Sequence, residues 1–135
     1  MRQMAFSTTM RAFLEDPHVA RLAVLDGEGF PHVVPIWYAA DVDDIVFFSS
    51  RDARKVAHIR ENGKGAVTIG GEPYGAEGYL LKGDFSLEED VDHHWLSEIV
   101  HRYEPKDLAD RHVTEWGAGD LVLIRFKPHK MIRIT

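Results

Sequence analysis

Short β-type segments, each ended by a polar turn, recur through most of the sequence. Ala20 to Leu25 precedes the turn residues Asp26 to Gly29, and a β-rich stretch extends from Pro31 to Ala39. A second polar turn, Asp41 to Asp44, leads into Ile45 to Ser49. Strands joined by turns this short pair with their neighbours in antiparallel fashion. The pattern therefore predicts an antiparallel meander and argues against alternating β-α-β units.

Further strands are expected along the rest of the chain. They are Gly65 to Ile69, Gly78 to Leu87, Leu121 to Phe126 and Lys130 to Ile134, with the last two joined by a turn at Lys127 to His129. Six or seven strands in 135 residues leave little room for long open edges, so closing the sheet on itself is the economical solution. We predict a mainly β fold, an antiparallel barrel with peripheral helices.

Apolar residues recur at helical spacing in three places. Their expected buried faces are Met10, Phe13 and Leu14 after a cap at Ser7 or Thr8; Ala53, Val56 and Ile59 within Asp52 to Asn62; and Val91, Trp95, Ile99 and Tyr103. Pro105 to Gly117 shows no such face that we could assign, and we expect it to be irregular.

Composition narrows the class of protein. The 16 Lys and Arg against 22 Asp and Glu give a net charge of −6, which disfavours a nucleic-acid partner. The absence of cysteine removes disulfides and thiolate chemistry, and no apolar run approaches the ~20 residues that span a bilayer. We expect a single cytoplasmic domain over residues 1–135, with no membrane partner.

Common catalytic motifs are missing. The sequence contains no Walker lysine loop, no Gly-x-Gly-x-x-Gly and no Gly-x-Ser-x-Gly. His94, Glu98 and His101 could share one helix face, but a solvated face is the better interpretation, and we expect no metal site.

The most informative charges lie between residues 51 and 64. This segment has five Lys and Arg against two acidic residues, and Arg54 and Lys55 fall near the start of a predicted helix, where cations oppose the helix dipole. A phosphate group bound by Arg54 and Lys55, with Ser49 or Ser50 adding hydroxyl groups, would explain them. A solvated basic face paired with Asp52 or Glu61 would explain them equally well.

Several segments together carry a resemblance to a known family. They are Arg21 to Tyr38, Ile45 to Ser50, Arg54 to Val56, Ile59 to Asn62, Gly78 to Gly83 and Val122 to Pro128. In this order they resemble the pyridoxamine 5′-phosphate oxidase-like superfamily, and more closely its small flavin and deazaflavin reductases. The resemblance implies a six- to seven-stranded antiparallel split β-barrel of the FMN-binding type, with a closing hairpin at its end.

The resemblance also implies a cofactor, which is FMN or, as an alternative, the deazaflavin coenzyme F-420. The site residues it implies are His32, Val33, Val34, Pro35, Ile36 and Trp37 beside the ring, Phe48 and Ser49 near ring and phosphate, and Arg54 and Lys55 on the phosphate. The side chains of Val33, Val34 and Ile36 fit the barrel core, so their contact with the cofactor would run mainly through the backbone. Trp37 fits the core and the cover of a planar ligand equally well.

One departure bears on the reaction. Pyridoxamine-phosphate oxidases of the family carry an arginine and a lysine where this chain has His32 and Trp37, and they have an Arg-rich C-terminal extension beyond the position of Thr135. We therefore expect a reaction other than vitamin B6 oxidation. The resemblance implies a homodimeric oxidoreductase acting on a small molecule; a non-catalytic flavin-binding or stress-associated module is the alternative. No catalytic side chain is assigned.

Overall fold

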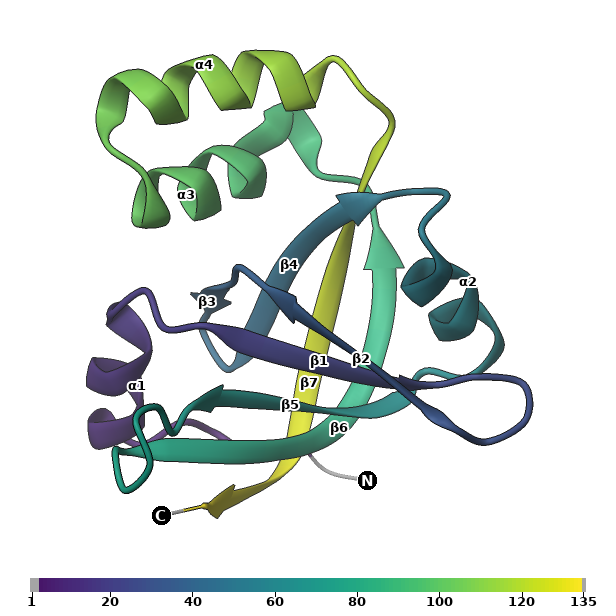
Figure 1. Cartoon of the computed structure of the whole chain (residues 1–135), viewed down its shortest axis with the longest axis vertical. Coiled ribbons are helices and arrows are strands. Elements are labelled where there is room, and N and C mark those ends of the chain that lie inside the picture. The colour runs from purple at the N-terminus through teal and green to yellow at the C-terminus, as the bar shows by residue number, and fades with distance from the viewer. Residues whose placement is uncertain (1–2, 135) are drawn as a thin grey trace.

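A computed structural model describes residues 3–134 as a strongly curled sheet with helices along its rim (Figure 1). Residues 1, 2 and 135, the ends of the predicted domain, lie outside the described residues. In chain order the elements are α1 Thr8–Glu15, β1 Ala20–Leu25, β2 Pro31–Ile36, β3 Ala39–Asp41, β4 Asp44–Ser50, α2 Arg54–Glu61, β5 Lys64–Gly70, β6 Gly78–Glu88, the short 3-10 helix η1 Val91–His93, α3 His94–Tyr103, α4 Lys106–Gly117 and β7 Leu121–Arg133.

The seven strands form one antiparallel sheet in the order β2-β1-β5-β6-β7-β4-β3. If this sheet were flat, its outer strands β2 and β3 would lie ~29 Å apart. Only Trp37 and Tyr38 connect them, and the step from Ile36 to Ala39 spans at most ~11 Å. The sheet must therefore curl until its edges meet without pairing, which confirms the predicted antiparallel barrel and its seven strands.

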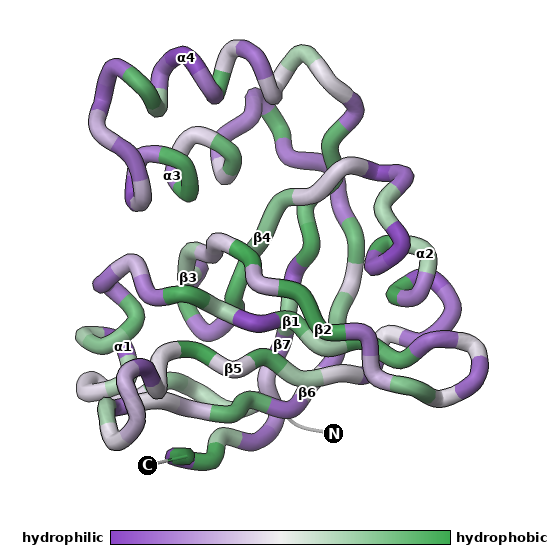
Figure 2. The backbone as a smooth tube through the Cα atoms, in the orientation of Figure 1, coloured by the Kyte–Doolittle hydropathy of each residue, from purple (hydrophilic) through white to green (hydrophobic). Residues whose placement is uncertain are grey.

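The interior of this barrel is apolar, and the outer face of β4 is apolar too. Ile45 and Phe47 point into the main core, whereas Val46 and Phe48 point outward and pack under α3 and α4. In Figure 2, β4 carries a long apolar stretch, and α4 is mostly hydrophilic with isolated apolar residues. The outward face of β4 thus supports a helical pair that stands on the rim of the barrel.

The stretch predicted to be irregular, Pro105 to Gly117, is in fact mostly helical, as α4 begins at Lys106. Its apolar residues Ala109, Val113 and Trp116 are spaced four and three apart and face α3, where Ala109 is fully buried. Because this apolar stripe is one residue wide and is surrounded by charged residues, the helix is hard to recognise from the sequence. The helix forms because α3 covers that stripe.

The turn predicted at Lys127 to His129 is also wrong, because β7 runs unbroken from Leu121 to Arg133. The register of β7 against β6 shifts at Gly83, which pairs with Pro128 while Lys82 pairs with Lys130, so His129 is the extra residue of a bulge. Proline is tolerated at such a bulge although it donates no hydrogen bond. The expected closing hairpin is therefore a single bent strand.

The third predicted helix begins later than its apolar stripe suggests. Val91 is 75% exposed, and Asp92 and His93 have left-handed backbone conformations that separate η1 from α3. The carboxylate of Asp90 accepts hydrogen bonds from the first amides of α3 and caps it. The buried face of α3 is consequently Leu96, Ile99 and Val100, with Tyr103 beside it.

The predicted strand from Pro31 to Ala39 is divided into β2 and β3 by Trp37 and Tyr38. The other expected helices form as predicted: Ser7 caps α1 through its hydroxyl, and α2 lies within the expected range. None of the helices in the described part of the chain is long and apolar enough to span a membrane.

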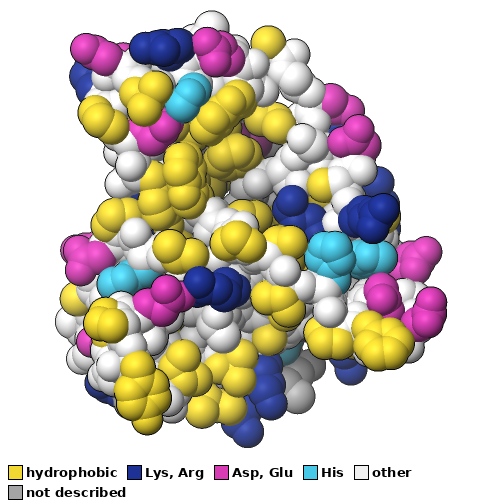
Figure 3. All heavy atoms as spheres, viewed as in Figure 1, with side chains coloured by type: hydrophobic (Ala, Val, Ile, Leu, Met, Phe, Trp, Pro, Cys, Tyr) yellow, Lys and Arg dark blue, Asp and Glu magenta, His cyan; other side chains and the backbone are white. Residues whose placement is uncertain are grey.

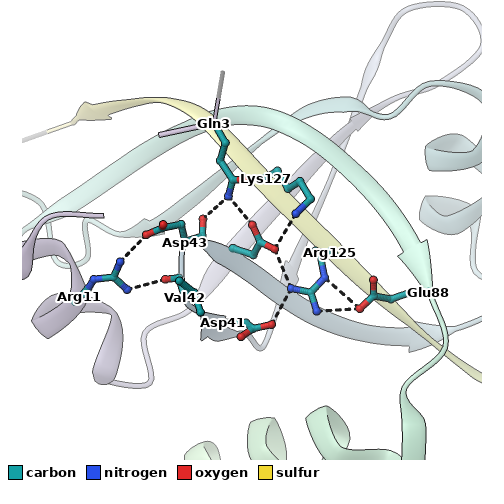
Figure 4. Close-up of polar contacts among 9 residues, drawn as sticks. Gln3, Arg11, Asp41, Val42, Asp43, Glu88, Arg125 and Lys127 are labelled. Carbon is teal, nitrogen blue, oxygen red and sulfur yellow. Dashed lines mark hydrogen bonds and ion pairs between the residues drawn. The ribbon is translucent and has the colours of Figure 1, made fainter. Parts of the chain in front are cut away.

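A network of charges ties the N-terminal segment to the β3-β4 hairpin (Figure 4). The buried carboxylate of Asp44 accepts hydrogen bonds from Gln3, from Arg125 at 2.9 Å and from Lys127 at 3.1 Å. Arg125 also contacts Asp41 and Glu88. The same hairpin holds α1, since Arg11 pairs with Asp43.

This network predicts an acid-sensitive component of stability. Burial alone would raise the pKa of Asp44, but the hydrogen bonds from Arg125, Gln3 and Lys127 outweigh burial and lower that pKa below its ordinary value. A lowered folded-state pKa gives stability that is present above the unfolded-state pKa of about 3.9 and is lost as pH falls through the folded value.

Asp44→Asn should therefore lower the free energy of unfolding by about 2 kcal/mol at pH 7 and by less as pH falls toward 3, as measured by urea denaturation. Asp52→Asn is the control, because Asp52 is exposed and has no ion pair among the described residues. A cost for Asp44→Asn that stays constant with pH would contradict the prediction.

Candidate functional site

The site predicted from the sequence follows β2, which is an edge strand that pairs only with β1. Val34 and Ile36 are half-buried and pack against the core, as expected. Val33 is 55% exposed, so its expected place in the core is wrong. Successive side chains of a strand point to opposite faces, and the outer face of β2 has no covering element among the described residues. Val33 and Pro35 therefore form an uncovered surface.

An aromatic pocket of about 350 Å³ opens at the end of β2. It is lined by Pro35, Ile36, Trp37, Phe48 and Trp116. Tyr103 of α3 stacks on Trp37, with ring centroids 4.8 Å apart and planes 4° from parallel. Figure 3 shows the corresponding hollow beneath α3 and α4, lined by hydrophobic side chains. The pocket offers flat apolar surfaces suited to a planar ligand.

Trp116 is the residue of this pocket that the sequence interpretation missed. It lies at the end of α4, where its ring is 6.3 Å from that of Trp37 and 6.1 Å from that of Phe48. His112, one turn earlier, stacks on Trp116 with ring centroids 4.2 Å apart, and it pairs with Glu104. The spacing of Ala109, Val113 and Trp116 was the available signal for this helix.

Basic side chains gather at the opposite end of β2. Arg54 is exposed and Lys55 half-buried in the first turn of α2, and neither side chain forms a hydrogen bond or ion pair with any residue between 3 and 134. Burial lowers the pKa of Lys55. His32 of β2 lies 5.4 Å from His58, which follows Arg54 by one helical turn. Figure 3 shows Lys, Arg and His side chains together over α2 and the neighbouring end of β2.

Two other candidates for anion binding are already engaged. Arg51 pairs with Glu89 at 2.8 Å and with Asp120 at 2.9 Å, which separates it functionally from Arg54 and Lys55. Ser49 is buried, and its hydroxyl donates to the carbonyl of Ser50. Phe48 and Ser49 point to opposite faces of β4, so only Phe48 reaches the aromatic pocket.

The arrangement suits an elongated ligand. From His32, beside α2, to Ile36, at the pocket, β2 extends ~13 Å. The start of α2 lacks a side-chain cap and carries two cations without partners, which fits a phosphate group. The far end is apolar and aromatic, which fits a planar ring system. A phosphorylated flavin or deazaflavin has this distribution of charge and shape.

Comparison with known families agrees with this site. The sequence model of the family described as pyridoxamine 5′-phosphate oxidase matches residues 6–133, nearly the whole chain. The chain belongs to the pyridoxamine 5′-phosphate oxidase family. Membership places it in the split-barrel superfamily that the sequence resembles, which includes oxidoreductases that bind flavin. A comparison with curated proteins finds no match.

Solved structures share the fold. An F-420 reductase superimposes with a TM-score of 0.71 at 21% identity, over 90% of this chain and 94% of that one. A conserved hypothetical protein from Mycobacterium tuberculosis gives 0.78 at 17% identity, over 98% and 89% of the two chains. General Stress Protein 26 from Bacillus anthracis gives 0.68 at 16%, over 91% and 88%. At sequence identities of 16–21%, these similarities show a shared fold and no more.

Metal chemistry receives no support from the geometry of the histidines. Within residues 3–134, no group of three or more His, Cys, Asp or Glu side chains is arranged to hold a metal ion. His101, one of the three residues weighed as possible metal ligands, contacts the carbonyl of Ser97 and the carboxylate of Asp110 on α4, each at 2.8 Å. The Ser97 carbonyl and, next, Asp110 raise the pKa of His101.

Proposed function

We propose that this chain binds FMN along β2 and acts as a flavin-dependent oxidoreductase on a small organic substrate. The observation that carries the proposal is the pair of cations without partners, Arg54 and Lys55, at one end of an edge strand whose other end opens into an aromatic pocket. Membership in a flavin-binding family supports the same assignment.

The residues of the chain have separable tasks in this proposal. Arg54 and Lys55 bind the phosphate, and the lowered pKa of Lys55 reflects a desolvated ammonium that an anion would stabilise. The backbone of β2 and the side chain of Phe48 position the ring, while Trp37 and Trp116 exclude water from one side of it. A bound flavin supplies the hydride chemistry, which needs no nucleophile from the protein.

Two alternatives have specific support. Binding of F-420 in place of FMN is supported by the structural likeness to an F-420 reductase and by His32 and Trp37, which differ from the oxidase pattern. A non-catalytic flavin-binding module is supported by the lining of the aromatic pocket, none of whose five side chains is titratable, and by the shared fold of a general stress protein.

We also propose a homodimer with equivalent sites at the subunit boundary. The uncovered apolar surface of β2, where Val33 is 55% exposed, and Phe30 just before the strand, which is 64% exposed, support an isologous contact beside the cofactor. Tm should then rise with protein concentration, because dissociation and unfolding are coupled. Light scattering that reports a folded, cofactor-loaded monomer would exclude the dimer.

The cofactor assignment predicts the outcome of three titrations followed by fluorescence. FMN is expected to bind with a Kd below about 10 μM, and riboflavin, which lacks the phosphate, at least tenfold more weakly, since the phosphate contacts are lost. Tighter binding of F-420 than of FMN would assign the deazaflavin alternative. If neither binds below about millimolar concentration, the cofactor proposal fails.

Turnover separates the enzyme from the binding module. The loaded protein is mixed anaerobically with NADPH or dithionite, and small organic acceptors are then added in turn. An oxidoreductase reoxidises in the presence of an acceptor at a rate that saturates with its concentration. If the bound flavin is reoxidised by every acceptor at the same rate as free flavin, the result would support the non-catalytic module instead.

A further inference from the structure

A second cluster of cations, made of residues other than those of α2 and β2, lies on the face of the sheet where β5, β6 and β7 run side by side. Lys82 pairs directly with Ala66 on one side and with Lys130 on the other, and Lys64 lies two residues before Ala66 on the same face. These three lysines help to line a pocket of about 380 Å³, here called the lysine pocket.

The placement of Lys82 opposite Lys130 is electrostatically unfavourable. Directly opposed side chains on antiparallel strands have Cβ atoms about 5 Å apart, and like charges at such positions destabilise the pairing. None of the three ammonium groups takes part in a hydrogen bond or ion pair with another residue of the described part of the chain. The concentration of unpaired positive charge stands out in a chain whose net charge is −6.

The carboxylate that lines the lysine pocket is already engaged. Asp84 lines the lysine pocket and is the register partner of Lys64, but its carboxylate contacts His129, the extra residue of the β7 bulge. The bulge turns His129 toward Asp84 and leaves the lysines without a carboxylate partner. Their aliphatic stems form the walls of the pocket, while their charged ends stay free to meet a ligand.

We propose that the lysine pocket binds a compact polyanion, a small molecule that concentrates two or more negative charges on one group, such as a phosphate ester or a polycarboxylate. The ligand would offset the repulsion between Lys82 and Lys130 and accept hydrogen bonds from all three ammonium groups. This site is separate from Arg54 and Lys55 and does not depend on the proposed cofactor.

The test titrates pyrophosphate and, in a second arm, citrate into the protein at ionic strength held constant with NaCl, followed by amide NMR. Saturable shifts centred on Gly65, Gly83 and His129 are expected, and the stronger of the two ligands assigns phosphate or carboxylate chemistry. Amides of α2 report any binding at Arg54 separately. Shifts that depend only on ionic strength would overturn the proposal.

Variants sharpen the test. Lys82→Gln and Lys130→Gln should each weaken polyanion binding at least about threefold, whereas Lys106→Gln should not, because Lys106 pairs with Asp110 on α4. Equal affinity in the two pocket variants and the wild type would overturn the proposal. The proposal would also be overturned if the two variants kept the wild-type affinity for polyanion but sedimented differently. That result would assign this face to a contact between two copies of the chain.

Thermal stability provides an independent readout. Without polyanion, Lys82→Gln should have a Tm equal to or above that of the wild type, because the repulsion from Lys130 is relieved. At ten times the Kd, pyrophosphate should raise the wild-type Tm by about 3–5 °C and the variant's Tm by clearly less. A lower Tm for the ligand-free variant would show that Lys82 is structural and would overturn the proposal.

Discussion

Replacing both Arg54 and Lys55 with alanine should weaken FMN binding by about a hundredfold to ten-thousandfold. Each side chain is expected to contribute about 1.5–3 kcal/mol through charge-assisted hydrogen bonds to phosphate, and each single variant should lose about tenfold to a hundredfold. The effect is large because neither cation has another partner among the residues that the structure describes. Fluorescence titration of the double variant with FMN measures it directly.

Two controls separate phosphate recognition from damage to the fold. Arg60→Ala removes an exposed cation from the same helix and should change FMN affinity less than twofold. Riboflavin affinity should be equal in the double variant and the wild type, because riboflavin has no phosphate. If the double variant binds FMN as the wild type does, Arg54 and Lys55 are a solvated helix face.

Replacing Arg102 with methionine should lower the free energy of unfolding by about 3–5 kcal/mol. The Arg102 guanidinium donates to the carbonyls of Tyr38 at 3.0 Å and Leu14 at 2.9 Å, with longer contacts at the end of α1. It also lies 4.9 Å from the centre of the Tyr38 ring. Methionine preserves much of the side-chain packing but removes every hydrogen bond from Arg102, and the Leu14 carbonyl then keeps only the Tyr38 hydroxyl as a side-chain donor.

Replacing Arg102 should also affect the candidate site. Tyr38 follows Trp37 in the link that closes the barrel, and Tyr103, next to Arg102, stacks on Trp37. Loss of Arg102 should therefore loosen the aromatic pocket as well as the fold. We expect a lower midpoint in urea denaturation and a changed tryptophan emission of the native state.

Arg111→Met is the matched control for this variant. Arg111 is exposed on α4, and its side chain has no hydrogen bond or ion pair with any other described residue, so its replacement should alter the free energy of unfolding by less than about 0.5 kcal/mol. Equal costs for the two variants would contradict the role assigned to Arg102.

Features that depend on near neighbours along the chain were predictable from the amino-acid sequence. Alternation and turn residues place β1, β4 and the start of β2 correctly, and Ser7 is recognisable as a helix cap, because these signals act within a few residues. The two cations Arg54 and Lys55 were apparent for the same reason, since a position within a helix decides whether a charge opposes its dipole.

Contacts between residues that are distant along the chain became apparent from the fold. Trp116 joins Trp37 and Phe48 because α4 packs on α3, and α4 is stable only with its single stripe of apolar residues covered. The proline in β7 looked like a turn until the register with β6 showed a bulge that accommodates it. Lys82 and Lys130 are far apart along the chain, and strand pairing alone places them opposite each other. Such contacts depend on packing and register between segments, which local sequence patterns do not encode.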